Sequence, residues 1–487
     1  MKDFRSYIPG VSDPAEFGVF ERSVHKTEKG EYVFTARTGK GDRIVAERSA
    51  GFKGEGFTGA DGKEYVLAEN CHENGELLRR LFPFTAPSPI LSKQRTVGTG
   101  DRLGIATPGH LRAFSRFDVY PVLAQQSVRE LNLTERDFEN VLDCASRAVF
   151  REDYTRGWGA DGDHLKTPEE VEYAISCGYT MITLDCSAYI KNVSAMTDQQ
   201  LEAEYIPNEM LENEYLTGPV KVSDALTVEM DMKTLMQAVI IYGKAIDFAA
   251  KIWRKHIKGR PVDFEISIDE TDTPTVPAHH YFVANELTKR GVEITTMAPR
   301  FCGEFQKGID YIGDLDQFRV EMKQHAAIAD AFGYKISVHS GSDKFSVFPS
   351  VGELTGQHFH LKTAGTSWLE AMKLVAMKDP ALYREIHGFA LENFTKATAY
   401  YHVTTDLSKI PALETLSDAE LPALFENSDA RQLIHITYGL ILTERNEDGS
   451  LRFKDRLYDL WNTYEEDYAA LLDAHIGRHL EMLCGER

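Results

Sequence analysis

The sequence has few cysteines and no excess of positive charge, and each shortage excludes a class of protein. Its six cysteines are irregularly spaced without a CxxC pair, which predicts reduced thiols in a cytoplasmic protein rather than a disulfide framework. The net charge of −21 argues against nucleic acid as a partner, because phosphates call for a basic surface. The sequence also lacks a signal peptide and any apolar run of about eighteen residues, so no membrane span is expected.

The N-terminal part of the sequence is rich in β-prone residues. Residues 1–100 alternate short β-prone runs with Gly and Asp turns, which predicts hairpins in an N-terminal region. Within it, "GEGFTG" (54–59) matches the GxGxxG pattern of dinucleotide-binding loops. A turn and a strand are expected after it instead of the required helix, so the dinucleotide interpretation is disfavoured.

From about residue 101, short apolar runs alternate with helical patterns. In "YKISVHSGS" (334–342), Ile336 and Val338 face one way while Ser337 and His339 face the other. Strands with helices outside and a polar interior would have this pattern, whereas an ordinary parallel sheet would be apolar on both faces. The eight expected strands are 102–110, 119–127, the GADGDH region (159–164), 179–187, 263–271, 292–300, 334–342 and 358–365.

Helix signals separate these strands. Thr167, Pro168 and Glu170 form a predicted capping box, and Gly291 and Gly333 are expected to end helices directly before strands. We therefore predict an α/β fold with a TIM-type (β/α)8 barrel over 101–400. It carries an insertion at 188–230, the β-rich region 1–100, and a helical C-terminal extension over 401–487 packed on the barrel.

Polar residues gather at the expected carboxyl ends of the strands, where such barrels keep their chemistry. His164 and His339 come from different strands and have acids beside them, which together favour a divalent cation, although His164 alone fits a loop histidine. Spacing does not choose a third ligand among Glu304, Gln306 and Asp310. Deeper in their strands, Glu265 and Lys335 are interpreted as an interior ion pair.

Four long runs together resemble the tagaturonate epimerase family over most of the chain: "GADGDHLK" (159–166), "DETDTPT" (269–275), "APRFCGEFQKGIDYIGD" (298–314) and "SVHSGSDKFSVFP" (337–349). The resemblance implies an isomerase, a metal-dependent epimerase that interconverts D-tagaturonate and D-fructuronate in hexuronate catabolism. A looser resemblance to class II ketose aldolases rests on Asp163-His164 and "HSGS" (339–342). The usual middle histidine of those aldolases has no counterpart here, and Gln306 is taken to stand in for it.

The chemistry of such an epimerase sets further expectations. The two ketouronates differ at C4, which has no neighbouring carbonyl, so retro-aldol cleavage of C3–C4 is favoured over direct deprotonation. We expect a divalent metal (Mn²⁺, Co²⁺, Ni²⁺ or Zn²⁺) on His164, Gln306 and His339. Asp163, or else Asp161, is the expected base, and Asp269 or Glu270 serves the opposite face or a substrate hydroxyl.

The substrate carboxylate requires a cation, for which Arg300, Lys344 and Lys362 are the candidates. Gln125, Ser340 and Asp343 are the other expected substrate contacts. The expected partner is a small-molecule ketouronate, with neither nucleic acid nor membrane, and homo-oligomerisation stays open. Two alternatives also stay open: a metal-dependent aldolase that releases its fragments, and a non-catalytic barrel that stabilises an aldolase.

Overall fold

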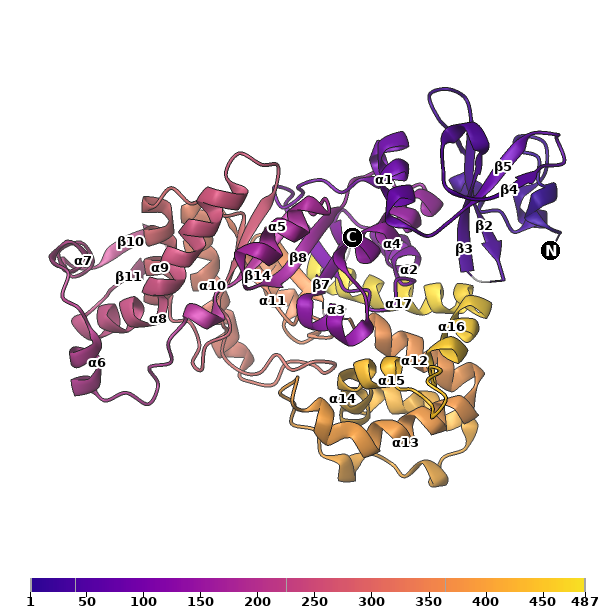
Figure 1. The fold of residues 1–487 in the computed structure, drawn as a ribbon. Coiled ribbons are helices and arrows are strands. Elements are labelled where there is room, and N and C mark those ends of the chain that lie inside the picture. Colours follow the sequence, from indigo (N-terminus) through magenta and orange to yellow (C-terminus); the bar gives the residue numbers. More distant parts are fainter. Residues whose placement is uncertain (1, 40, 225, 364, 486–487) are drawn as a thin grey trace.

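A closed eight-stranded parallel barrel forms the centre of the computed structural model, which describes residues 2–39, 41–224, 226–363 and 365–485 (Figure 1). The predicted TIM-type barrel is therefore confirmed. In chain order its strands are β6 (Arg95–Thr99), β7 (Tyr120–Ser127), β8 (Gly159–Leu165), β9 (Met181–Asp185), β12 (Asp263–Ser267), β13 (Thr296–Ala298), β14 (Lys335–Val338) and β15 (Phe359–Thr363).

The first strand was misplaced by the sequence analysis, while the other seven predicted strands overlap observed ones. Residues 102–110 form a turn and the start of α2 (Thr107–Phe114) instead of a strand. The physical reason is local. The side chain of Asp101 accepts hydrogen bonds from the backbone N–H groups of Leu103, Gly104 and Ala106, and Pro108 favours a helix start. Strand β6 closes the barrel by pairing with β15 and β7.

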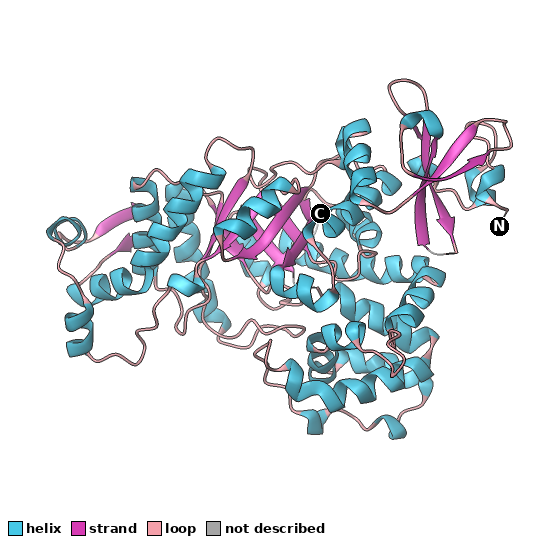
Figure 2. Cartoon of the chain, viewed as in Figure 1, coloured by secondary structure: helices cyan, strands magenta, loops and turns pink. Residues whose placement is uncertain are grey.

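Helices cover the outside of the barrel (Figure 2). The predicted capping box at Thr167 and Glu170 begins α5, and Gly333 ends α10 in the left-handed conformation, as expected. The helices of this layer are α2, α3 (Val128–Thr134), α4 (Phe138–Glu152), α5 (Pro168–Ser176), α8 (Met232–Ile252), α9 (Pro277–Lys289), α10 (Leu315–Phe332) and α11 (Phe348–Leu354).

The N-terminal region is a five-stranded antiparallel sheet in the order β1-β2-β3-β5-β4. Gly54–Thr58 of the GxGxxG match is strand β4, which pairs with β5, so no phosphate-binding turn leads into a helix there. The elements of this region are β1 (His25–Lys26), β2 (Tyr32–Thr38), β3 (Gly41–Glu47), β4, β5 (Glu64–Ala68) and α1 (His72–Leu81).

The insertion after β9 projects from one side of the barrel and contains α6 (Asp198–Glu204), α7 (Glu209–Tyr215), β10 (Val220–Ser223) and β11 (Leu226–Val228) (Figure 1). The C-terminal helices are α12 (Ser367–Lys378), α13 (Pro380–Ala397), α14 (Ser428–Ile436), α15 (Tyr438–Thr443), α16 (Lys454–Thr463) and α17 (Glu465–Cys484).

The eighth strand is covered in an unexpected way. Helix α12, which follows β15, shares an apolar core with α13–α16 and the first half of α17. The last helix, α17, also packs against α2 and α11. Ile476, Leu480 and Leu483 of α17 belong to the core of the barrel. None of the helices in the described residues is both long and apolar enough to span a membrane.

Candidate active site at the mouth of the barrel

A cavity of about 640 Å³, here called the mouth cavity, opens at the carboxyl end of the barrel. Its wall combines strand ends with the loops after β12 and β13, and His402 of the C-terminal extension also contributes. In (β/α)8 barrels this face carries the chemistry. The wall includes nine of the residues predicted from the sequence: Gln125, Asp163, His164, Asp269, Glu270, Gln306, His339, Ser340 and Lys362.

Two histidines and an aspartate come together in this wall. The ring centroids of His164 and His339 are 5.0 Å apart, and Oδ2 of Asp269 lies 3.3 Å from Nδ1 of His339. Donor atoms of the three residues all lie within 4.8 Å of one another. Nδ1 of His339 is buried and has no hydrogen-bond partner among the described residues. Two imidazoles and a carboxylate at this spacing fit a divalent cation.

Each histidine is held by a second carboxylate. Nδ1 of His164 lies 2.8 Å from Oδ1 of Asp163, and Nε2 of His339 lies 2.7 Å from Oε1 of Glu265. Such carboxylates fix the ring of a metal-binding histidine and make it more basic. Burial alone would lower the pKa of His339, but Asp269 and Glu265 raise that pKa to about 10. A cation would therefore have to displace a proton from this ring.

The backbone at these strand ends is strained. His164, Ser340 and Asp343 have φ angles of 54°, 48° and 58°, in the left-handed region that residues other than glycine rarely adopt. Strand β8 also breaks register between Gly162 and Leu165, which re-aims His164 at the point where the strand ends. Strain of this kind persists where surrounding contacts enforce it, and it clusters at functional sites.

Three carboxylates surround the ammonium group of Lys362 in the barrel interior. Its Nζ lies 2.7 Å from Asp161 and 3.3 Å from Glu265, and it also pairs with Asp163. Burial alone would raise the pKa of Asp163, but Lys362 and His164 hold that pKa well below its usual range. For Asp161 burial prevails and raises the pKa to about 6. Asp161 is fully buried and lies outside the cavity wall, so it acts on Lys362 rather than on a ligand.

The predicted ion pair between Glu265 and Lys335 is wrong. Glu265 pairs with Lys362 and His339, whereas Nζ of Lys335 donates hydrogen bonds to the carbonyl of Lys93 and to Oγ1 of Thr96. Both side chains do point into the barrel, as the period of two predicted.

The side-chain amide of Gln306 is fixed by the C-terminal extension. Its Oε1 accepts hydrogen bonds from the backbone N–H of Thr404 at 3.0 Å, from Oγ1 of Thr404 at 3.1 Å and from Nε2 of Gln432 at 3.0 Å. Because a backbone N–H can only donate, the oxygen is assigned and its lone pairs are in use. Nε2 of Gln306 is buried without a partner among the described residues. In this arrangement Gln306 offers the cavity a donor and is poorly suited to bind a metal.

Three more of the predicted residues lie outside the cavity wall. Nζ of Lys344 donates to the carbonyls of Gln306, Ile309 and Ser342, so it supports the loop that carries Gln306. Arg300 follows β13; its backbone N–H donates to Oγ1 of Thr275, and its carbonyl accepts the backbone N–H of Thr275. The third residue, Asp343, is treated next.

Asp343 joins the end of β14 to the C-terminal helices. Its carboxylate lies 2.8 Å from Arg431 and 3.2 Å from His475. Asp343, His475 and His479 have the spacing of a second metal cluster, but both ring nitrogens of His479 are in use. They contact the carbonyl of His475 at 2.8 Å and the backbone N–H of Asp343 at 3.0 Å. This cluster therefore connects the end of β14 to the C-terminal helices and is not proposed as a metal site.

Sequence reasoning missed Lys307 and Glu130, which both line the mouth cavity. Burial lowers the pKa of Lys307 to about 8, although Glu130 opposes the shift. Nζ of Lys307 donates a hydrogen bond to Oγ of Ser340 at 3.0 Å. Glu130 belongs to a capping box with Ser127 and pairs with Arg102 at 2.9 Å. Signals for both were present: Lys307 directly follows Gln306, and Ser127 and Glu130 have capping-box spacing at a strand end.

Comparison with known proteins gives a consistent result. Residues 20–483 match the family model UxaE, described as tagaturonate epimerase. A curated Thermotoga maritima protein named tagaturonate/fructuronate epimerase is 42% identical over 477 residues, 96% of this chain and 97% of that protein. Among solved structures, fructuronate-tagaturonate epimerase UxaE from Cohnella laeviribosi, complexed with one glycerol, is 50% identical with a TM-score of 0.91 over 96% of both chains. The same protein with two glycerols gives 49% and 0.92, over 96% of this chain and 97% of the other.

Proposed function

Because this chain belongs to the tagaturonate epimerase family, we propose that it interconverts D-tagaturonate and D-fructuronate at C4 in the mouth cavity. The observation that carries the proposal is the grouping of His164, Asp269 and His339 in the wall of that cavity, in a chain matched almost end to end by named epimerases. We further propose a retro-aldol route and a divalent cation.

The retro-aldol route balances without an outside oxidant. A base takes the proton of the C4 hydroxyl, C4 becomes an aldehyde as the C3–C4 bond breaks, and the bonding pair forms a C2–C3 enolate. The aldehyde then presents its other face, C3 attacks it, and the proton returns to the C4 oxygen. The hydrogen on C4 is never removed, so the route avoids an unstabilised carbanion. The cavity must retain both three-carbon fragments while the aldehyde turns.

We propose His164, Asp269 and His339 as the residues that hold the cation, with Asp269 replacing the predicted Gln306. The set fits because it offers two imidazoles and a carboxylate, and because buried Nδ1 of His339 faces the Asp269 carboxylate at 3.3 Å, the spacing of two ligands of one cation. A divalent cation at this position would supply Lewis acidity for the C2 oxygen. Asp163 and Glu265 orient the two rings from behind.

Proton transfer then falls to the carboxylates that line the cavity and are not proposed ligands. Asp163 and Glu270 remain from the predicted set, and an epimerase needs a group for each configuration at C4. Lys362 contacts Asp163 and keeps it ionised, ready to accept a hydrogen bond from a hydroxyl. Asp161 supports Lys362 from below.

For the substrate carboxylate we propose Lys307 as the cation. Of the three predicted candidates, Arg300 and Lys344 lie outside the wall, and the charge of Lys362 is already balanced by carboxylates. Lys307 lines the cavity and, among the described residues, forms no ion pair, while burial lowers its pKa. A bound carboxylate would restore the stability of its charged form.

The test is to strip the protein with a chelator, add back Mn²⁺, Co²⁺, Ni²⁺ or Zn²⁺, and follow D-tagaturonate in deuterated water by NMR. D-Fructuronate is expected only after metal is restored, with hydrogen retained at C4 and no free three-carbon products. Full activity without metal would exclude the cation, and obligatory deuterium at C4 would exclude bond cleavage. Accumulating fragments would identify an aldolase instead.

A further inference from the structure

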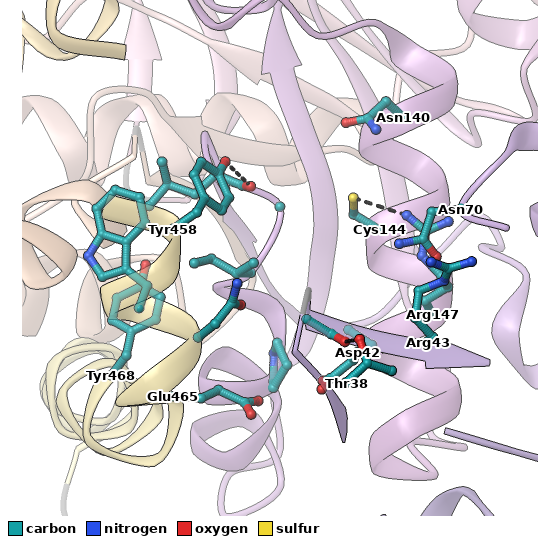
Figure 3. Close-up of a pocket in the computed structure, with 18 of the residues that line it drawn as sticks. Thr38, Asp42, Arg43, Asn70, Asn140, Cys144, Arg147, Tyr458, Glu465 and Tyr468 are labelled. Carbon is teal, nitrogen blue, oxygen red and sulfur yellow. Dashed lines mark hydrogen bonds between the residues drawn. The ribbon is translucent and has the colours of Figure 1, made fainter. Parts of the chain in front are cut away.

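A second cavity, of about 910 Å³, lies where distant parts of the chain meet (Figure 3). Three parts supply most of its wall: β2 and β3 of the N-terminal sheet, α4 with the loop before it, and α16 with the start of α17. Residues 102–108, between β6 and the start of α2, also contribute to the wall. Among the described residues it shares no wall residue with the mouth cavity. The proposed function does not use it, and we call it the arginine cavity.

Part of its positive charge is balanced and holds the three parts together. Arg151 of α4 lies 2.5 Å from Asp42 of the N-terminal sheet and also pairs with Glu465 of α17. Arg37 of the same sheet pairs with Glu465 as well. These ion pairs fix the walls of the cavity in place and need no further partner.

Three other guanidinium groups in the wall form no ion pair within the described ranges: Arg43, Arg136 and Arg147. Arg43 donates from two nitrogens to the carbonyl of Ala68, and Arg136 donates to the carbonyl of Asp101 at 2.6 Å. Within the described residues, the polar contact of the Arg147 guanidinium is with the thiol of Cys144, at 3.4 Å, and Figure 3 shows this contact beside Arg43 in the same wall. Unbalanced guanidinium groups are unexpected in a chain with a net charge of −21.

Two of these guanidinium groups, those of Arg136 and Arg147, lie beside the thiol of Cys144. A Cβ atom added to Gly104 would lie 3.0 Å from both Nη2 of Arg136 and Sγ of Cys144, so these two atoms border the same space. Arg147, one turn further along α4, contacts the same thiol at 3.4 Å. Nη2 of Arg136 is buried and has no hydrogen-bond partner among the described residues. The other two nitrogens of this guanidinium are bonded, Nη1 to the carbonyl of Asp101 and Nε to Oδ1 of Asn140 at 2.7 Å. Leaving the buried N–H groups of Nη2 without an acceptor is costly, so Nη2 is the nitrogen that a ligand would bind.

We propose that the arginine cavity binds a small anion carrying a phosphate or at least two carboxylates. Guanidinium groups bind both kinds of anion with paired hydrogen bonds. The acids in the wall do not fill this role: Asp42 and Glu465 pair with Arg151, and Asp459 is exposed and forms no ion pair among the described residues. Oδ1 of Asp137 accepts the backbone N–H of Asn140 at 2.7 Å, and Glu135 pairs with Arg445 at the surface. The cavity volume falls in the range of small-molecule sites, about 300–1,000 Å³.

The arginine cavity is also connected to the mouth cavity. Arg102 lies in the wall of the first, Glu130 lies in the wall of the second, and the two side chains form a buried ion pair at 2.9 Å. An anion bound beside Arg102 would compete with Glu130 for the guanidinium charge. Glu130 in turn acts on Lys307, the proposed carboxylate-binding residue. Occupancy is therefore expected to change the apparent KM for the ketouronate.

The experiment is a calorimetric titration of the metal-loaded protein with inorganic phosphate and, separately, with succinate, which distinguishes a phosphate site from a carboxylate site. Arg147→Gln and Arg43→Gln should each weaken binding by at least about tenfold. Arg136→Gln should do the same, although Arg136 also supports the loop at Asp101, so the first two variants carry the test if it fails to fold. Lys307→Met, in the mouth cavity, is the matched control: it can reach the anion only through Glu130 and Arg102, so it should change the Kd by less than about threefold.

Three results would overturn the proposal. If neither phosphate nor succinate binds the wild type with a Kd below about 10 mM, the cavity has no anionic ligand of the proposed kind. Loss of anion binding in Lys307→Met, with binding kept in Arg147→Gln, would place the anion in the mouth cavity. The same conclusion would follow if the added anion changed the apparent KM for the ketouronate equally in the wild type and in Arg147→Gln. A dimer that dissociates in Arg147→Gln without any anion would assign the cavity to a carboxylate of a second copy.

Discussion

The mouth cavity and the arginine cavity differ in how their charges are balanced. In the mouth cavity Lys362 has three carboxylates around it and His339 has two, so the charges around the proposed cation site are paired before a ligand arrives. In the arginine cavity, Arg136 and Arg147 form no ion pair within the part of the chain that the structure describes. Balanced charge suits a preorganised reaction site, whereas surplus charge suits uptake of a counter-ion. Removing a cationic side chain should therefore lower the free energy of unfolding at the mouth cavity and leave it nearly unchanged at the arginine cavity.

The largest effect is expected at His339. His339→Ala removes one proposed ligand and leaves Asp269 and Glu265 without their shared partner. We expect loss of bound metal, measured by elemental analysis, and a fall in kcat/KM of at least about a thousandfold. His402, which is exposed at the rim of the same cavity, is the matched control, and His402→Ala should keep its metal.

Elemental analysis also decides whether Asp269 or Gln306 is the third metal ligand. Asp269→Asn should weaken metal binding by about 10–100-fold, whereas Gln306→Leu should keep the metal because its oxygen is occupied by Thr404 and Gln432. Metal retained in His339→Ala would contradict the whole site. The reverse result for Asp269 and Gln306 would restore Gln306 as a ligand.

Lys362→Met comes next and tests the balance of charge through stability. It leaves Asp161, Asp163 and Glu265 buried without their counter-ion, a change that costs about 3–5 kcal/mol of unfolding free energy. Lys335→Met is the matched control in the same barrel interior. Lys335 forms no ion pair among the described residues, and burial lowers its pKa to about 7, so its loss should cost less in denaturant unfolding. Equal losses in the two variants would show that Lys362 is not balanced as described.

Lys307→Met should raise the KM for the ketouronate by about 10–100-fold, the value of one charge-assisted contact, with little change for a neutral ketohexose. Since burial lowers the pKa of Lys307 to about 8, its charge is lost as the pH rises through that value. Therefore kcat/KM for the ketouronate should fall above about pH 8, and Lys307→Arg should remove this fall. A raised KM in Arg300→Met with none in Lys307→Met would return this role to Arg300.

Much of the mouth cavity was predictable because it is built at strand ends. A period of two placed Glu265 and His339 on the inner face, and barrel geometry brought His164 and His339 to the same end. The first strand was missed because Arg95–Thr99 ("RTVGT") is short and contains a glycine. Asp269 was predicted as an acid and not as a ligand, because strand period fixes the face of a residue but not its distance to a neighbour.

The remaining features depend on contacts that no local pattern encodes. Gln306 is fixed by Thr404 and Gln432, about a hundred residues later in the chain. The arginine cavity joins the N-terminal sheet, α4 and α16, so its arginines were scattered through the sequence without a shared motif. A site assembled from one repeated unit can be read from the sequence, whereas a site assembled between regions requires the structure.

The smallest expected effect completes the comparison. Among the described residues Arg147 has a polar contact with the thiol of Cys144 and with no carboxylate, so Arg147→Gln removes a charge that no described carboxylate balances. In the absence of added anion we expect the free energy of unfolding to stay within about 0.5 kcal/mol of the wild type, with unchanged epimerase activity. Denaturant unfolding beside Lys362→Met would then show a large loss in one cavity and none in the other. A loss of several kcal/mol in Arg147→Gln would mean that this guanidinium is already paired and that both cavities are balanced alike.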